Sequence, residues 1–372
     1  MVQDAVDRAM ALAITAGERG RRTAPPNPWV GCVLLQDGEV IGEGFHERPG
    51  APHAEVAALR AAGDRARGAT AVVTLEPCSH HGRTGPCADA LLTAGVDRVI
   101  VALEDPDERV RGGGIARLRA AGVDVVIGPG AGEAARSLAP YLTHRRTGRA
   151  FCVVKTAVSI DGRTTAADGT SQWITGADAR ADAHRLRAES QAVIVGSGTA
   201  LADRPALTAR EVEPPVERPP LRVLLDARGR VPADGPLFDV AAAPTLVLTT
   251  DHAPASRVDD WRAAGAKVEA LPAGGDGGVD LAAALDLLGR LQVLQALVEG
   301  GATVHGSLIG AGLADRIIAY VGGVVLGPAG RPVFDMPGPA TIADAGRWRL
   351  TGVEPMGADV RLDYEPLVRE AG

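Results

Sequence analysis

One histidine and two cysteines place the strongest restriction on how this chain can fold. His53 begins the string His53-Ala54-Glu55, and Cys78 and Cys87 each follow a proline further along the sequence. One imidazole and two thiolates can hold Zn²⁺ in a tetrahedral site whose fourth position stays open to water. The fold must then bring these three side chains together, so we predict a zinc site formed by His53, Cys78 and Cys87.

Glu55 has the position expected of a proton carrier beside such a metal. A zinc ion lowers the pKa of a water that it binds, so hydroxide becomes available near neutral pH. Two residues beyond His53, at the start of the same helix, the Glu55 carboxylate can face the open position without binding the metal. It can take a proton from the water and deliver it to a ring nitrogen and a leaving amine. We therefore predict that Glu55 is the catalytic residue of a deaminase.

The spacing of the cysteines departs from the short signature of zinc deaminases that act on nucleobases. That signature is H-x-E followed by P-C-x-x-C, whereas eight residues, SHHGRTGP, separate Cys78 from Cys87 here. We expect both cysteines at or near helix starts, where the helix dipole favours the thiolate. His80 and His81 in the insert are rival ligands, and two buried thiols beside a structural histidine are the other interpretation.

The first 147 residues alternate helical and strand-like segments, which favours a largely parallel, layered sheet. The expected helices are 2–20, 53–62, 87–94, 113–121 and 131–142, and the expected strands are 29–36, 39–45, 71–75, 99–103 and 123–127. Asp37-Gly38 is a turn-compatible pair that joins two of these strands in a hairpin. The polar string THRRTGR at 143–149 lacks an apolar period, so we place a domain boundary between residues 147 and 148.

Residues 148–372 are expected to form a second α/β domain. Strand-like runs lie at 151–158, 192–195, 222–225, 245–249, 296–299 and 317–321, with helical stretches between several of them. The proline-bearing segments 213–220 and 232–244 indicate loops. Two further β-like segments, near 347–353 and 359–363, can form a last hairpin, so the second sheet is expected to be mixed.

The composition argues against a nucleic-acid or membrane protein. The formal net charge is −7 and only 3% of residues are aromatic, whereas a nucleic-acid deaminase needs a basic groove and stacking aromatics. No apolar run is long enough to cross a membrane, and the first 20 residues lack the pattern of a secretory signal. We expect a cytoplasmic protein, with Cys32 and Cys152 in its cores because both lie in apolar strand-like runs.

Two glycine-bearing junctions in the second half can bind the phosphates of a nucleotide. Val195–Thr199 and Val298–Thr303 each follow a strand-like run and can aim backbone N–H groups at a phosphate, helped by the dipole of a following helix. Taken alone, each junction is more often an ordinary turn. The chain strongly prefers arginine to lysine, and Lys155 is one of only two lysines.

Three strings in the first half carry a resemblance to a known family. They are NPWVGCVL, GFHERPGAPHAE and EPCSHHGRTGPCADAL. They resemble the deaminase half of the bifunctional riboflavin-biosynthesis deaminase/reductase family, in which a long insert between the two cysteines is typical. The resemblance implies a cytidine-deaminase-like, three-layer α/β/α domain in residues 1–147. It also implies that Asn27, the only asparagine, and His46 line a pyrimidine pocket, where an amide can donate and accept at once.

Some positions in this half depart from that family or stay open. Trp29 stands where a smaller or polar residue is usual, and Gly85 replaces a common proline. Arg83 and the string DPDERVRGGG at 105–114 either contact the substrate phosphate, shape the pocket or form a solvated, glycine-rich loop. From the sequence alone, Asn27 is equally well a turn residue before Pro28.

Five strings in the second half continue the resemblance. They are KTAVSIDG from Lys155, SQWITG from Ser171, LRA from Leu186, LADRPALTAR from Leu201 and EGG from Glu299. They resemble the reductase half of the same family, which is similar in fold to dihydrofolate reductase, although Arg204 stands where a second aspartate is common. The resemblance implies a dihydrofolate-reductase-like α/β domain in residues 148–372 that uses NADPH.

The resemblance also implies a role for individual residues of this half. The implied NADPH-binding residues are Ala157, Trp173, Thr199, Asp203, Gly301, Ala302, Thr303, Val304, His305, Gly306 and Ser307. The implied substrate-binding residues are Ser171, Arg187, Leu207, Arg210 and Glu299. Arginine suits a ribose-bound phosphate because it binds bidentately, although surface salt bridges are the plain alternative. We further predict that Lys155 is catalytic and polarises the opened ribose as hydride arrives.

Two consecutive reactions on a phosphorylated pyrimidine follow from the resemblance. The first is zinc-dependent hydrolytic deamination of 2,5-diamino-6-(5-phosphoribosylamino)pyrimidin-4-one, and the second is NADPH reduction of the ribosyl side chain to ribityl. The family also leads us to expect a homo-oligomer. One rival is a nucleic-acid deaminase with an appended module. The other is a binding or regulatory protein in which one half has lost turnover, and it concerns the second half most because no equally diagnostic catalytic residue occurs there.

Overall fold

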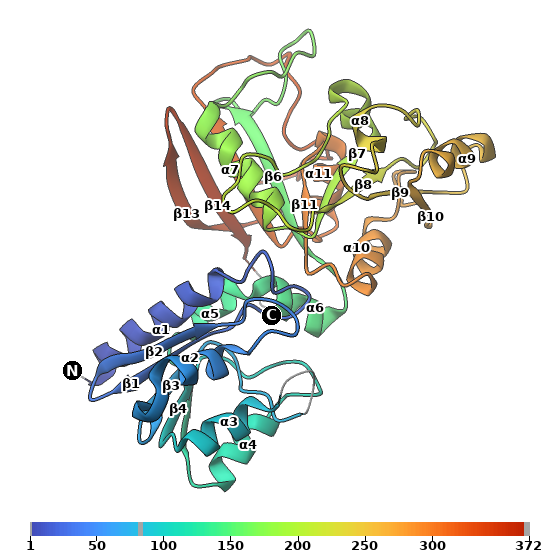
Figure 1. Ribbon diagram of the computed structural model, residues 1–372. Coiled ribbons are helices and arrows are strands. Elements are labelled where there is room, and N and C mark those ends of the chain that lie inside the picture. The colour runs from blue at the N-terminus through green and yellow to red at the C-terminus, as the bar shows by residue number, and fades with distance from the viewer. Residues whose placement is uncertain (1, 81–84, 368–372) are drawn as a thin grey trace. The chain divides into compact units, whose positions relative to one another are not determined.

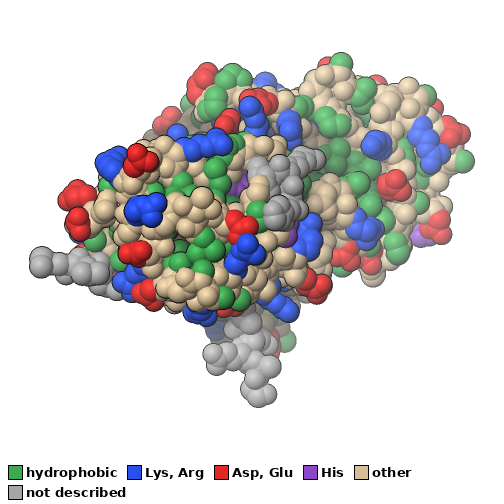
Figure 2. All heavy atoms as spheres, turned by 60° about the horizontal axis from the view of Figure 1, so that its bottom comes forward, with side chains coloured by type: hydrophobic (Ala, Val, Ile, Leu, Met, Phe, Trp, Pro, Cys, Tyr) green, Lys and Arg blue, Asp and Glu red, His purple; other side chains and the backbone are tan. Residues whose placement is uncertain are grey.

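The computed structural model describes residues 2–80 and 85–367 and divides the chain into two compact units (Figure 1). Unit 1 is Met1–Gly148 and unit 2 is Arg149–Gly372. Within the described ranges, no helix is long and apolar enough to cross a membrane. On the face drawn in Figure 2, basic and acidic side chains are interspersed rather than gathered by sign.

Unit 1 is built on a five-stranded sheet in the order β2-β1-β3-β4-β5. The strands are β1 Gly31–Gln36, β2 Glu39–Phe45, β3 Thr70–Val73, β4 Arg98–Val101 and β5 Asp124–Ile127. The expectation of a largely parallel sheet is only half right, because β1 pairs antiparallel with both β2 and β3, and only β3, β4 and β5 run parallel. The β1–β2 hairpin itself is confirmed: Asp37 and Gly38 have φ of 53° and 85°, as a tight two-residue turn requires.

Helices cover both faces of this sheet and make unit 1 a three-layer α/β/α structure. The helices are α1 Val2–Glu18, α2 Ala54–Ala62, α3 Cys87–Ala94, α4 Gly113–Ala120, α5 Ala131–Ser137 and α6 Ala139–Thr147. Side chains alternate along β1, so Cys32 and Leu34 pack with α2, α3 and α4, whereas Val33 and Leu35 pack with α1 and α5 (Figure 1). The three-layer fold implied by the resemblance is confirmed.

The end of unit 1 differs from the expected helix and polar linker. The segment expected as one helix is divided at Leu138 into α5 and α6, and α6 continues through most of the polar string to Thr147. Pro140 near the start of α6 fits this division, because proline is tolerated in the first turn of a helix but not in its interior. Gly148, with φ of 79°, ends α6, and unit 2 begins at the next residue.

Unit 2 contains a nine-stranded mixed sheet in the order β10-β9-β8-β7-β11-β6-β12-β14-β13. The strands are β6 Phe151–Ser159, β7 Ala192–Gly196, β8 Leu221–Leu225, β9 Thr245–Thr249, β10 Lys267–Ala270, β11 Gln295–Val298, β12 Arg316–Gly322, β13 Trp348–Met356 and β14 Asp359–Pro366. The first seven strands in this order run parallel, and β14 pairs antiparallel with both β12 and β13, which confirms the expected mixed sheet. Strand β10 escaped the sequence analysis because it is short, polar and largely exposed.

The helices of unit 2 connect the parallel strands. They are α7 Ala177–Ala188, α8 Ser197–Asp203, α9 Ala255–Ala263, α10 Leu281–Arg290 and α11 Ala302–Gly310. Strand β7 leads directly into α8, and β11 leads into α11 after three residues. Because β7 and β11 are parallel neighbours, both junctions lie at the carboxyl ends of the strands, where ligands bind in open α/β sheets.

Candidate active sites

The structure brings the three predicted metal ligands of unit 1 together. His53 is the residue before α2, Cys87 is the first residue of α3, and the three ligand atoms lie within 4.8 Å of one another. His53 Nδ1 is 3.1 Å from Cys87 Sγ and 3.6 Å from Cys78 Sγ. A tetrahedral zinc with normal bond lengths separates such atoms by about 3.6 Å, so the residues fit this metal. In the described ranges the metal-binding cluster has these three members and does not include His80.

Cys78 lies in the irregular segment after β3, so the expectation that it lies at or near the start of a helix is wrong for this cysteine. The backbone N–H of Cys87 compensates by donating to Cys78 Sγ at 3.4 Å. Hydrogen bonds from Cys87 and His53 lower the pKa of Cys78 to about 4, although burial opposes this. The side-chain hydrogen bond with Cys78, together with burial, raises the pKa of Cys87. Cys78 is thus the member of the pair that more readily becomes a thiolate, which is the form that binds a metal.

Glu55 lies on α2 beside these ligands and is almost completely buried, with 3% of its surface exposed. Burial raises the pKa of its carboxyl group, and the nearby His53 imidazole acts in the opposite direction. The Cys87 side chain also lowers the pKa of this carboxyl group. The acid predicted to carry protons thus lies at the metal site and is shielded from bulk water.

Asn27 and His46 lie next to the same site. Asn27 Nδ2 is 3.0 Å from His46 Nε2, and the His46 and His53 rings meet edge to face with centroids 5.1 Å apart. His46 Nδ1 lies 3.2 Å from the Pro52 carbonyl oxygen, so this nitrogen carries the proton and Nε2 accepts from the amide. Burial lowers the pKa of His46 and favours this neutral form. The two residues predicted to line a pyrimidine pocket therefore belong to one hydrogen-bonded group beside the metal ligands.

The sequence also singled out two core cysteines, Trp29 and two residues of the insert between Cys78 and Cys87. Cys32 is buried in β1 and Cys152 in β6 of unit 2, both as expected for core residues. Trp29 is also buried, and its indole N–H donates to Ser137 on α5 at 3.2 Å. His81 and Arg83 lie outside the described residues.

Lys155, Arg187 and Glu299 form a charged cluster in unit 2. Arg187 at the end of α7 donates to both carboxylate oxygens of Glu299, at 2.5 and 2.7 Å. Burial alone raises the pKa of Glu299, but the charges of Arg187 and Lys155 lower it to about 2. Burial lowers the pKa of Lys155, and Glu299 opposes this. Glu299 thus stays ionised between two cations.

Residues 207–210 pack against the same part of α7. Arg187 donates to the Thr208 carbonyl oxygen at 3.0 Å, and the Arg210 backbone N–H donates to His184 Nδ1 at 3.3 Å. Leu207 is buried and has φ of 51°. Four of the five predicted substrate-binding residues of this half therefore lie around one cluster. Sequence reasoning missed His184, because a lone histidine on a helix carries no signal of its own.

The two glycine-bearing junctions meet at the carboxyl ends of β7 and β11. The Gly196 N–H donates to the Gly300 carbonyl oxygen at 2.9 Å. A Cβ placed on Gly301 would lie 3.0 Å from Thr199 Oγ1, and one placed on Gly196 would lie 2.8 Å from a Val304 methyl group. The helix starts of α8 and α11 therefore form a close cradle of small residues that suits a dinucleotide phosphate.

The other predicted NADPH-binding residues are spread more widely. Ala157 lies in β6, and Asp203 ends α8. Ser171 and Trp173 lie in the loop between β6 and α7, where Trp173 is 68% exposed. The later part of the 301–307 segment faces the protein instead. His305 is buried with Nε2 3.3 Å from the Val298 carbonyl oxygen, and Ser307 donates to Asp276 at 2.8 Å.

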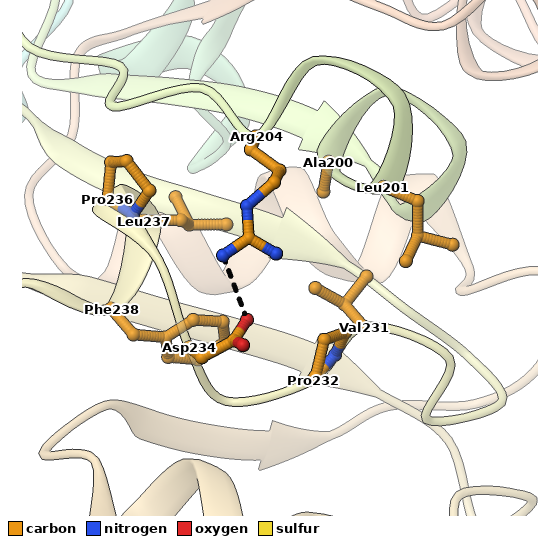
Figure 3. Close-up of a pocket in the computed structure, with 9 residues that line it drawn as sticks. All are labelled: Ala200, Leu201, Arg204, Val231, Pro232, Asp234, Pro236, Leu237 and Phe238. Atoms are coloured by element: carbon orange, nitrogen blue, oxygen red, sulfur yellow. Dashed lines mark ion pairs between the residues drawn. The ribbon is translucent and has the colours of Figure 1, made fainter.

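A small pocket lies between α8 and the segment that follows β8 (Figure 3). Its lining residues are Ala200, Leu201, Arg204, Val231, Pro232, Asp234, Pro236, Leu237 and Phe238. Arg204 and Asp234 pair across it at 3.3 Å, which gives Arg204 a partner within this unit. None of the predicted site residues lines this pocket.

Two protein-family models match this chain. A model of the cytidine and deoxycytidylate deaminase zinc-binding region matches residues 4–103, and a model of the RibD C-terminal domain matches residues 150–362. The RibD protein of Escherichia coli is 42% identical over 363 residues, which cover 95% of this chain and 97% of the relative. The chain belongs to the RibD family. The resemblance read from the sequence strings is therefore confirmed.

Solved structures of RibD proteins match nearly all residues of this chain. Acinetobacter baumannii RibD has a TM-score of 0.86 and 38% identity, covering 98% of this chain and 99% of that one. The deaminase/reductase of Thermotoga maritima has a TM-score of 0.84 and 29% identity, covering 99% and 100%. Like other RibD proteins, this chain is a bifunctional enzyme of riboflavin biosynthesis with zinc-dependent deaminase and NADPH-dependent reductase activities.

Proposed function

We propose that the two units catalyse consecutive steps on one phosphorylated pyrimidine. Unit 1 replaces an amino group of 2,5-diamino-6-(5-phosphoribosylamino)pyrimidin-4-one by oxygen from water and releases ammonia. Unit 2 uses NADPH to reduce the ribosyl side chain of the uracil product to ribityl. The observation that carries the proposal is the convergence of His53, Cys78 and Cys87 beside the buried Glu55. The names of the Thermotoga maritima protein, a diaminohydroxyphosphoribosylaminopyrimidine deaminase and 5-amino-6-(5-phosphoribosylamino)uracil reductase, support the same substrates.

The residues of unit 1 divide the work of deamination. His53, Cys78 and Cys87 would hold zinc, which would supply a water of lowered pKa. Glu55 would take a first proton from the attacking water and give it to the ring nitrogen, and would then move a second proton, from the new hydroxyl group, to the leaving amine. The Asn27 amide, oriented by the neutral His46 ring at 3.0 Å, binds the edge of the pyrimidine.

The charged cluster of unit 2 serves the reduction. Lys155 lies beside the reacting carbon of the opened ribose and stabilises the negative charge that develops as hydride arrives. Glu299, kept ionised by Arg187, accepts hydrogen bonds from the sugar hydroxyl groups. Arg210 binds the substrate phosphate, and the cradle formed by Gly196, Thr199 and Gly301 binds the NADPH phosphates.

The remaining expectations concern the whole protein. We propose a cytoplasmic homo-oligomer that takes no nucleic acid, as the resemblance to the family implied. The RibD relatives support the small phosphorylated substrate. Light scattering of the purified protein measures the oligomeric state directly.

Purified, zinc-loaded protein given the phosphoribosylaminopyrimidine tests the proposed function. We expect release of ammonia followed by oxidation of NADPH, and oxidation of NADPH without ammonia when the deaminated uracil is supplied instead. A wild-type protein that releases no ammonia shows that the substrate is wrong and returns other deaminases to consideration. If the protein binds NADPH but does not oxidise it, the alternative interpretation is favoured, in which the second half has lost its reductase activity.

A further inference from the structure

Glu76 holds a distant loop against the metal site of unit 1. This side chain is 4% exposed, and its two carboxylate oxygens accept four backbone N–H groups. Oε2 accepts from Asp105 at 3.3 Å and Gly112 at 3.0 Å, and Oε1 accepts from Gly114 at 3.0 Å and Ile115 at 3.2 Å. One carboxylate thereby joins both ends of the segment 105–115, which we name the clamp loop.

The start of α4 explains why a carboxylate suits this place. The first N–H groups of a helix have no partner within the helix, and the helix dipole attracts negative charge there. The N-cap residue of α4 is Gly112, which has no side chain to accept from them. Glu76 supplies the missing acceptor from another part of the chain, so its charge is satisfied although it is buried.

The glycines of the clamp loop allow it to lie directly on the cysteine segment. A Cβ on Gly114 would overlap the Pro77 carbonyl oxygen, which is backbone and cannot turn away. A Cβ on Gly113 would lie 2.6 Å from Ser79 Oγ, which can rotate. The residues on either side of Cys78 are thus in contact with the start of α4.

Val110 carries this arrangement to the metal ligands. Its side chain is 7% exposed and forms one buried cluster with Cys78 and Cys87. It lies between the two ends of the clamp loop that Glu76 fixes. An apolar side chain against the thiolates limits the access of water to them, and such surroundings control metal affinity.

We propose that Glu76 is a positioning residue of the metal site. It fixes the clamp loop so that Val110 covers Cys78 and Cys87, and this cover slows the loss of zinc. The proposal rests on the proposed ligand set, and it concerns a residue that touches neither the metal nor the substrate.

The test is the rate at which zinc-loaded, full-length protein loses zinc to excess chelator, at a temperature where circular dichroism shows every variant folded. Glu76→Gln keeps the shape but turns one acceptor oxygen into a donor that faces other donors. We expect it to release zinc about 10- to 100-fold faster. Glu108→Gln, an exposed glutamate on the same loop, is the matched control and should match wild type.

Val110→Ala shows whether Glu76 acts through the clamp loop. It leaves the carboxylate and its four hydrogen bonds in place, so it should fold and should by itself accelerate zinc release. Because both changes remove the same cover, the double variant should release zinc no faster than the faster single variant. The proposal is overturned if folded Glu76→Gln or Val110→Ala releases zinc at the wild-type rate. It is also overturned if the effects of the two changes are fully additive in the double variant. If zinc binding survives Cys78→Ser, the ligand set fails and this inference fails with it.

Discussion

At the residue scale, the reductase half depends on one lysine in a cluster of charges. Lys155 lies beside Glu299, which Arg187 holds at 2.5 and 2.7 Å. Replacing it by methionine keeps the length and packing of the side chain but removes the positive charge that stabilises the negative charge developing as hydride reaches the imine of the opened ribosylamine. We expect NADPH oxidation with the deaminated uracil to fall by about 10²-fold or more, while ammonia release stays at the wild-type rate.

Lys267→Met is the matched control for this change. Lys267 is the only other lysine, is exposed and lies on β10 at the edge of the same sheet. Its replacement should leave both rates unchanged. If Lys155→Met oxidises NADPH at the wild-type rate, Lys155 is not a catalytic residue. The affinity of the variant for NADPH, measured by fluorescence, separates a role in binding the cofactor from a role in the chemical step.

The sequence predicted individual residues well where several residue types must meet for one chemistry. His53, Glu55, Cys78 and Cys87 stand out because zinc chemistry demands this set, and the structure brings them together. Glu76 could not be found in the same way. Its partners are backbone N–H groups more than two dozen residues away, and a backbone group carries no sequence signal; only the three consecutive glycines from Gly112 marked the place.

At the scale of elements, the loop after β4 is tied to α6 by a buried acid. The Tyr141 hydroxyl donates to both carboxylate oxygens of Asp105 at 3.1 Å. Burial raises the pKa of Asp105 from its usual value of 3.8 to about 6. A carboxyl group that binds its proton more tightly in the folded state stabilises the fold at low pH, and this contribution is lost as the pH rises through the folded pKa.

We therefore expect unit 1 to lose stability between about pH 4 and pH 6, by up to about 3 kcal/mol from this group. Asp105→Asn cannot ionise, so its free energy of opening should vary less with pH in this window than that of wild type. Hydrogen exchange of amides in β3 and β4, corrected for intrinsic rates, measures this. Equal pH dependence in the two proteins is the result that contradicts the assignment.

Elements were predicted best where a continuous apolar run is buried in a core and least well at chain joints. The strands of unit 1 stand out because β1, β3 and β4 are apolar on both faces. The polar string 143–149 looked like a linker, but α6 buries Tyr141, Leu142 and His144 and so continues as a helix. The direction of β1 relative to β3 was missed because pairing depends on contacts that the local pattern does not contain.

At the scale of the whole molecule, the two activities belong to separate units with separate cores. Zinc ligands occur in unit 1, whereas the Lys155 cluster lies in unit 2. Removing zinc with a chelator should therefore abolish ammonia release and leave NADPH oxidation with the deaminated uracil intact. Restoring zinc should restore ammonia release. Loss of both activities on chelation shows that the reductase depends on the metal site.

The most direct test of two sites working in sequence uses Glu55→Gln, zinc-loaded and folded as wild type. With the phosphoribosylaminopyrimidine, we expect ammonia release to fall by about 10²- to 10⁴-fold, and NADPH oxidation to fall with it for want of substrate. With the deaminated uracil, the same variant should oxidise NADPH at the wild-type rate. Ammonia release at the wild-type rate, or NADPH oxidation that stays low with the uracil, contradicts this account.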